Sequence, residues 1–201
     1  MAEYQVTVSG KTYQLEEPFF VMATQNPIEM EGVYNLPEAQ LDRFLFRIFV
    51  TMPSAEELSR ILQQTTTPHA PSVSQILSTA SAREWILNAR RLVREVLVAK
   101  PVEDYTVRLV SATHPNGASS SPVAQRLIRY GASPRGAQAI LMGAKVRALV
   151  KGRVNVSFED VDRMLLPALN HRLVLSFEAE AERRTAVDIL RELTEPIRAQ
   201  R

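Results

Sequence analysis

The stretch PFFVMATQNPIE at residues 18–29, with LPEAQLDRF at residues 36–44, decides the fold of this chain. Residues 19–24 are apolar on both faces, which is typical of a buried strand in a parallel sheet. This strand should end at Asn26, because Pro27 cannot donate to a strand ladder. Residues 39–44 are predicted to form a short helical turn, and residues 45–51 a second apolar strand.

The segment before this stretch predicts a β-hairpin. Residues 5–8 and 11–14 alternate in polarity, and Ser9 and Gly10 form a turn pair between them. A hairpin and two apolar strands cannot cover both faces of a parallel sheet. We therefore expect this part to belong to a larger α/β structure, or to assemble with something that completes the sheet.

From Ser54 onward the apolar period changes from 2 to 3.6, which predicts helices. Capping boxes are expected at Ser54, Ser81 and Ser157, and Ser133 followed by Pro134 predicts another helix start. Residues 85–96 carry an apolar stripe with Trp85, which we expect in the core. Helices are also predicted over residues 123–130, capped by Gly131, and over residues 178–193.

The fold class is thus mostly α, with two parts. Residues 1–53 are predicted as the C-terminal remnant of an α/β core, and residues 54–201 as an all-helical bundle. The formal net charge of +2 is too small to indicate a nucleic-acid surface, so a DNA-binding bundle is disfavoured. The chain has no cysteine, and its three histidines lack metal-ligand spacing, so no metal site is expected. No segment is predicted to span a membrane.

Three motifs in chain order resemble those of MoxR-family AAA+ ATPases. The stretch at residues 18–44 resembles the sensor-1 to arginine-finger region, GASPRG at residues 131–136 resembles sensor 2, and HRLVL at residues 171–175 resembles a signature near the end of the lid. The sequence departs from the family pattern at Met30, Val33 and Asn35. The resemblance implies an AAA+ core remnant followed by a helical lid, and ATP hydrolysis as the parent activity.

Asn26 is the candidate for sensor 1. It would lie at the carboxyl end of a strand, the edge where open α/β sheets bind ligands. A neutral amide there can orient a water or contact the γ-phosphate. The alternative is that Asn26 caps a strand-to-loop turn.

Arg43 is the candidate arginine finger. Its guanidinium is permanently charged and can fork onto phosphate oxygens. The resemblance implies that it reaches the ATP site of a neighbouring subunit. The alternatives are a surface ion pair with Asp42 or Glu38, or Arg47 as the finger.

Arg135 is the candidate sensor 2, at the second position of a helix whose N-terminus already favours anions. The family role is to couple the angle of the lid to the nucleotide state. The alternative is a solvated helix start. The hairpin at residues 4–14 resembles the pre-sensor-1 hairpin of this branch, and an ordinary edge hairpin is the alternative.

The printed sequence contains no Walker A motif. The nearest match, Gly10-Lys11-Thr12, lies in the predicted hairpin turn, where a P-loop would need a helix after it. No apolar strand ends in Asp-Glu, so a Walker B motif is also missing. In the family these motifs precede the region where this chain begins. We therefore expect a truncated reading frame or a split protein that does not hydrolyse ATP alone.

The resemblance implies ATP and Mg²⁺ as cofactors of the complete protein, with neither held tightly by this chain. It also implies a homo-oligomeric ring, a hexamer, in the cytoplasm, with a client protein and a partner of the von Willebrand factor A type. Hydrolysis would drive chaperone-like remodelling or cofactor insertion in the client. The alternative is a non-enzymatic helical protein-interaction module.

Overall fold

The computed structural model describes residues 4–25, 36–68, 73–117 and 120–200. The chain divides into two compact units. The first comprises residues 1–32 and 49–91, and the second comprises residues 33–48 and 92–201. The division predicted between residues 53 and 54 concerns family domains, and it stays a prediction.

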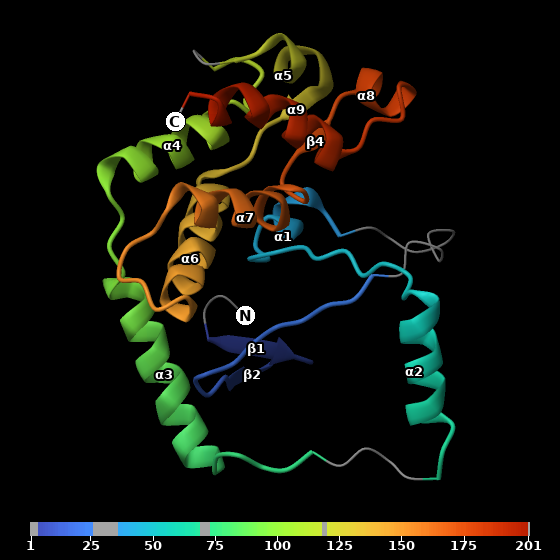
Figure 1. Cartoon of the computed structure of the whole chain (residues 1–201), viewed down its shortest axis with the longest axis vertical. Helices are drawn as coiled ribbons and strands as arrows, with labels where there is room; N and C mark the ends of the chain where they lie inside the picture. The colour runs from blue at the N-terminus through green and yellow to red at the C-terminus, as the bar shows by residue number, and fades with distance from the viewer. Residues whose placement is uncertain (1–3, 26–35, 69–72, 118–119, 201) are drawn as a thin grey trace. The chain divides into compact units, whose positions relative to one another are not determined.

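The first unit begins with the expected hairpin (Figure 1). Strands β1 (Gln5–Val8) and β2 (Lys11–Gln14) pair antiparallel, with Val8 opposite Lys11. The two residues between them, Ser9 and Gly10, have φ angles of 49° and 79°. Positive φ at both central residues is the geometry of the tight turns that match the twist of a hairpin.

The two apolar segments form no strand within the described residues, so the strand predictions at residues 19–24 and 45–51 are wrong for this chain. Phe20 and Met22 are each 82% exposed and Val50 is 95% exposed. The cause is that a strand apolar on both faces needs neighbouring strands and covering helices, and the described residues place none beside these segments. The prediction that the fold is mostly helical is confirmed.

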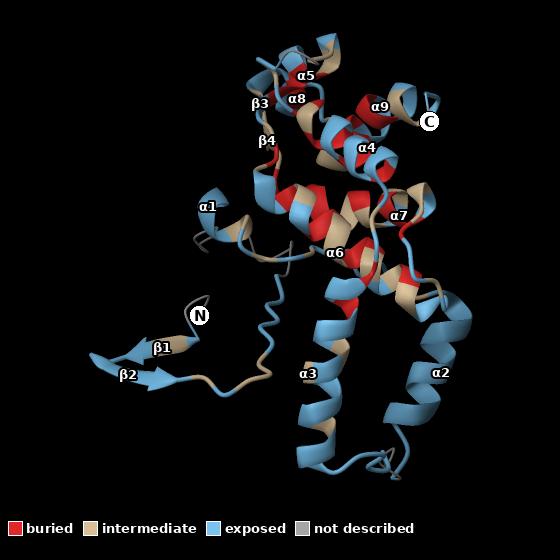
Figure 2. Cartoon of the chain, turned by 90° about the vertical axis from the view of Figure 1, so that its left-hand side faces the viewer, coloured by how far each residue is buried: buried red, intermediate tan, exposed pale blue. Residues whose placement is uncertain are grey.

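Helix α2 (Ala55–Thr65) begins at the predicted capping box, in which Ser54 and Glu57 exchange side-chain and backbone hydrogen bonds. Helix α3 (Thr79–Glu95) begins earlier than expected. The Ser78 Oγ accepts a hydrogen bond from the Ser81 N–H in the first turn of this helix. Ser81 therefore lies inside the helix, and the predicted cap at Ser81 is wrong. Trp85 is 65% exposed, against the expectation of a core position. Figure 2 shows α2 and most of α3 as exposed surface.

The second unit contains the remaining helices and a small sheet. The elements are α1 (Glu38–Leu41), α4 (Lys100–Ser111), α5 (Pro122–Leu127), β3 (Ile128–Tyr130), α6 (Pro134–Val150), α7 (Phe158–Leu169), β4 (Val174–Leu175), α8 (Phe177–Ala181) and α9 (Ala186–Arg198). Strands β3 and β4 pair antiparallel. The capping box predicted at Ser157 is confirmed, with Asp160 as its partner.

The core of this unit lies where α4, α6, α7 and α9 pack together, as the buried residues in Figure 2 show. Its largest fully buried side chains include Tyr105, Leu109, Ile140, Leu165 and Leu169. A second cluster joins α5 to α8 and α9 through Leu127 and Ile189. These helices therefore form a body with its own hydrophobic interior.

Two helix predictions need correction in this unit. Helix α5 ends at Leu127 and the chain continues as β3, so Gly131 is not its cap. A Cβ at Gly131 would lie 2.6 Å from the Thr113 carbonyl oxygen, so the close approach of another segment explains this glycine. The predicted helix over residues 178–193 is two helices, α8 and α9, because Arg183 adopts a φ of 55° between them.

Among the described helices, none is long and apolar enough to cross a membrane.

Candidate functional site

The segment that carries Arg43 follows the single turn of α1. The Asp42 and Phe44 amides continue the turn by donating to Glu38 and Leu41. The Arg43 side chain is exposed, and within the described part of the chain its guanidinium makes no hydrogen bond or ion pair. The ion pair with Asp42 or Glu38 that we considered for Arg43 is therefore not seen.

Helix α6 begins as the sequence predicts. Ser133 is the N-cap, Pro134 occupies the first helical position, and the Ser133 Oγ accepts from the Arg135 N–H at 3.2 Å. The Ser133 hydroxyl also donates to the Asp42 carboxylate at 2.7 Å. The Arg135 guanidinium reaches the same carboxylate at 3.0 Å. The candidate sensor 2 thus contacts the residue beside the candidate finger.

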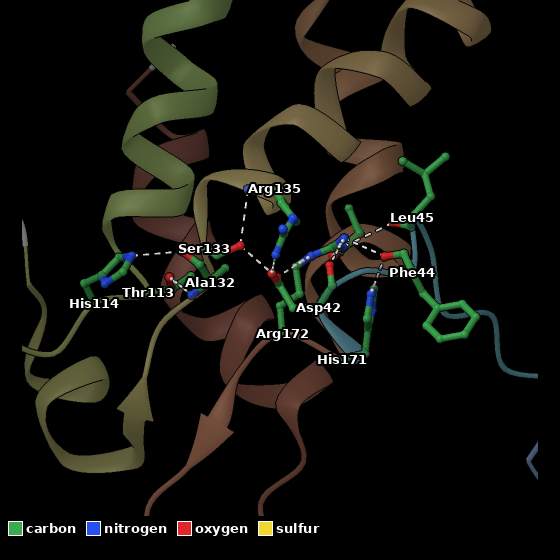
Figure 3. Close-up of polar contacts among 11 residues, drawn as sticks. Asp42, Phe44, Leu45, Thr113, His114, Ala132, Ser133, Arg135, His171 and Arg172 are labelled. Carbon is green, nitrogen blue, oxygen red and sulfur yellow. Dashed lines mark hydrogen bonds and ion pairs between the residues drawn. The ribbon is translucent and has the colours of Figure 1, made fainter. Parts of the chain in front are cut away.

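The end of α7 supplies a second arginine to Asp42. Arg172 Nε donates to Asp42 Oδ1 at 3.1 Å, and the Arg172 side chain is only 2% exposed. Arg172 Nη2 donates to the carbonyls of Asp42 and Phe44 at 3.1 and 2.5 Å. Figure 3 shows this guanidinium lying among backbone carbonyls, with the Asp42 carboxylate between Arg172 and Arg135.

Residues that follow α4 form hydrogen bonds with the backbone just before α6. The Thr113 Oγ1 accepts from the Ala132 N–H at 3.0 Å, and His114 Nε2 donates to the Ala132 carbonyl at 3.0 Å (Figure 3). The close packing of Gly131 on Thr113 belongs to the same contact. These bonds fix the backbone from which Ser133 and Arg135 project.

The Asp42 carboxylate carries the negative charge that pairs with Arg135 and Arg172. Burial alone would raise the pKa of its carboxyl, but hydrogen bonds from Ser133 and Arg135 and the charge of Arg172 hold that pKa below its ordinary value. Burial lowers the pKa of the Arg172 guanidinium, and Asp42 opposes this change. An arginine remains charged in proteins, so the pair is ionic.

His171 adds an uncharged contact. Its Nε2 donates to the Phe44 carbonyl at 3.1 Å, and its buried Nδ1 has no hydrogen-bond partner among the described residues. Burial lowers the pKa of the imidazole, and the positive charges of Arg172 and Arg47 act in the same direction. The ring therefore favours its neutral form.

The structure brings two of the three predicted residues toward one another. Arg135 contacts Asp42, and Asp42 precedes Arg43 in the chain. Asn26 lies outside the described residues. The part that the sequence did not reveal is the role of Asp42 and Arg172. The signal was present, because Arg172 belongs to the quoted HRLVL motif, but no local pattern says which carboxylate it binds.

The arrangement has the chemical groups needed to bind phosphate. Two guanidinium groups, Arg43 and Arg135, are presented at the surface on segments that are themselves fixed, and Arg135 stands at the N-terminus of a long helix. No cluster of His, Asp and Glu able to hold a metal ion occurs in the parts of the chain that the structure describes.

Comparison with known proteins gives two family matches in chain order. Residues 1–46 match the ATPase family associated with various cellular activities (AAA), and residues 121–193 match the AAA lid domain. The first match includes Asp42 and Arg43, and the second includes Arg135 and Arg172. The contacts at Asp42 therefore join a core motif to the lid.

Curated relatives agree with these matches. The chaperone MoxR1 of Mycobacterium tuberculosis is 42% identical over 90% of this chain, and protein MoxR of Paracoccus denitrificans is 32% identical over 94%. The uncharacterized protein YeaC of Bacillus subtilis is 37% identical over 98%. The chain spans 47–58% of the lengths of these relatives.

A solved structure shares the fold. The crystal structure of a candidate ATPase from Cytophaga hutchinsonii superposes with a TM-score of 0.85 at 35% identity, over 96% of this chain and 57% of that one. The matches to core and lid, the MoxR relatives and the shared fold support the resemblance found in the motifs. The chain belongs to the MoxR family of AAA+ ATPases, and it matches the C-terminal part of their ATPase fold with its lid.

Proposed function

We propose that this chain supplies the sensing and trans-acting residues of a MoxR-type ring ATPase. The observation that carries the proposal is the link between its two exposed arginines. Arg135 binds the Asp42 carboxylate at 3.0 Å, and Arg43 is the next residue in the chain. A helical module that only bound other proteins would have no need for two exposed arginines, one bound to Asp42 and the other directly after Asp42 in the chain.

The proposed reaction is the in-line attack of water on the γ-phosphate of ATP. Asn26 orients or senses the attacking water, and Arg43 stabilises the transition-state charge in the site of the neighbouring subunit. Arg135 reports the state of the phosphates to the lid. ATP and Mg²⁺ are bound mainly by Walker A and Walker B motifs, which the printed residues lack, so this chain is inactive alone.

In this proposal, residues 1–53 serve as the C-terminal part of the α/β core, and residues 54–201 as the lid. The exposed apolar segments support the division, since Phe20, Met22 and Val50 would be covered by the rest of a parallel sheet. The subunits assemble as a hexameric ring in the cytoplasm. The ring brings Arg43 of one subunit to the nucleotide of the next.

The work done by hydrolysis is proposed from the relatives. One of them is named as a chaperone, MoxR1. By analogy, the assembled protein would remodel a client protein or insert a cofactor into it, together with a partner of the von Willebrand factor A type.

The test is ATP turnover by this chain mixed with a purified AAA+ segment that carries the Walker A and Walker B motifs. Arg43→Ala should lower turnover by about 10³-fold, at the low end of the range for arginine fingers. Arg47→Ala is the matched control, because Arg47 is the competing candidate, and it should retain most of the activity. If Arg47→Ala is the slow variant, the finger is Arg47. If the mixture is inactive, a non-enzymatic interaction module becomes the better account.

A further inference from the structure

The segment that contains Arg43 is fastened to the lid through its backbone. Successive residues at the end of α7 donate to its carbonyl groups: Asn170 to Arg47 at 3.0 Å and His171 to Phe44 at 3.1 Å. In return, the Arg47 amide donates to the Pro167 carbonyl at 2.9 Å. Residues 33–48 accordingly fall in the same compact unit as the lid helices.

Arg172 makes the largest number of these contacts. All three nitrogen atoms of its side chain donate. Nε donates to the Asp42 carboxylate, Nη1 to the Leu45 and Ala168 carbonyls, and Nη2 to the Asp42 and Phe44 carbonyls. Such a set requires the planar fork of a guanidinium, which the single ammonium of lysine cannot reproduce. The accepting residues Asp42 and Phe44 lie directly before and after Arg43.

We propose that Arg172 is a positioning residue for Arg43, and that it acts through Asp42 and the carbonyls on either side of the finger. The inference rests on the proposed function of Arg43. The Arg172 side chain is buried, and its nitrogens donate to Asp42 and to backbone carbonyls, so its effect is to fix the backbone from which the exposed Arg43 side chain projects. Consequently the position of Arg43, on the core, depends on a lid residue of its own subunit.

The two arginines on Asp42 have different parts in this arrangement. The Arg172 side chain is 2% exposed and fully engaged, whereas that of Arg135 is 57% exposed and binds Asp42 through one nitrogen. A phosphate could therefore draw Arg135 away from Asp42 and leave the carboxylate bound by Arg172 and Ser133. The backbone around Arg43 would keep its contacts with Arg172, while Arg135 exchanges the Asp42 carboxylate for a phosphate.

The first test uses ATP turnover of the same mixture with Arg172→Lys, Arg43→Ala and the double variant. Misplacing a catalytic group by about 1 Å can cost about 100-fold in rate, so Arg172→Lys should lower kcat by about 10- to 100-fold with little change in KM for ATP. The double variant should be no slower than Arg43→Ala alone. Arg126→Lys is the matched control. It alters an exposed lid arginine that is ion-paired with Glu178 and Glu182, and kcat should stay at the wild-type value.

A second test needs no turnover. In the 201-residue chain, hydrogen exchange of the Phe44 and Arg47 amides should accelerate about tenfold or more in Arg172→Lys, while amides inside α6 keep their protection. If Arg172→Lys does not fold, Asp42→Asn replaces it in both tests, because it removes the carboxylate charge and keeps the backbone carbonyl. Unchanged exchange at Phe44 and Arg47 would overturn the positioning role.

The outcomes separate this inference from the proposed function. If Arg43→Ala turns over at the wild-type rate, Arg43 is not the finger and the proposed function fails. If Arg43→Ala is slow but the Arg172→Lys effect multiplies with it, Arg172 supports only the fold, and the positioning inference fails. A slow single variant with no further loss in the double variant supports both.

Discussion

The Nε of Arg172 donates to the Asp42 carboxylate at 3.1 Å, across 130 residues of sequence. Asp42 also forms an ion pair with Arg135. One carboxylate therefore binds a buried arginine that follows α7 and an exposed arginine at the start of α6. This three-residue contact joins the segment with Arg43 to helices of the second unit. We expect the stability of the second unit to depend on this contact.

Removing the carboxylate should destabilise the second unit. In Asp42→Ala the buried Arg172 keeps its carbonyl partners but loses its counter-charge, and leaving a buried charge unpaired costs about 3–5 kcal/mol. Urea denaturation followed by circular dichroism measures the change. Lys100→Ala removes an exposed ion pair with Asp104 and should leave the midpoint almost unchanged. Equal midpoints for Asp42→Ala and the wild type would contradict the role of this carboxylate.

Gly131 should not tolerate a methyl group. A Cβ there would meet the Thr113 carbonyl oxygen at 2.6 Å, and a backbone atom cannot move aside cheaply. Overpacking of this kind costs about 1–3 kcal/mol. At Gly117 the nearest atom would be 3.6 Å away, so Gly117→Ala is the matched control with little expected change. Thermal unfolding of the two variants gives the comparison, and equal melting temperatures would argue against the tight contact.

Asp160 should make stability depend on acid pH. Its burial raises the pKa of the carboxyl, but hydrogen bonds from Arg153 and Ser157 outweigh this and lower the pKa from 3.8 to about 2. The carboxyl therefore stabilises the folded state above pH 3.8, and this contribution is lost as the pH falls from about 4 to 2. The shift corresponds to about 2 kcal/mol. The wild type should lose this increment relative to Asp160→Asn in urea titrations over that range, and parallel pH profiles would contradict it.

The imidazole of His171 should titrate below its ordinary pKa of 6.5. Burial is the main cause, and Arg172 and Arg47 add to it. Because the folded pKa is lowered, the neutral ring contributes stability above pH 6.5, and the contribution declines as the pH falls toward the folded pKa. Two-dimensional NMR of the ring nitrogens measures the titration, with the urea-unfolded chain as reference. A folded pKa equal to or above the unfolded one would disprove a neutral buried ring.

Local features of the fold could be predicted from the sequence. The hairpin turn and the helix starts at Ser54, Ser133 and Ser157 are confirmed, because each depends on residues within three or four positions of one another. The family motifs also predicted the AAA+ assignment, because each motif is a short run of neighbouring residues and the motifs follow a fixed order along the chain.

Features that depend on distant contacts could not be predicted. Trp85 has the period of a core residue but lies exposed, since periodicity does not say whether a covering element is present. The break at Arg183 comes from a positive φ that arginine rarely adopts, so nothing in the sequence signals it. Asp42 and Arg172 are ordinary charged residues until the fold brings them together. The site residue Asn26 lies outside the described residues, and its role stays a prediction.

The most direct test of the central claim is nucleotide binding and ATP turnover by the chain alone and after mixing with a purified segment that bears the Walker motifs. The account predicts that the chain alone neither binds ATP tightly nor hydrolyses it. The mixture should hydrolyse ATP, and Arg43→Ala should lower the turnover by about 10³-fold. Hydrolysis by the chain alone, or a mixture that works equally well without Arg43, would contradict the account.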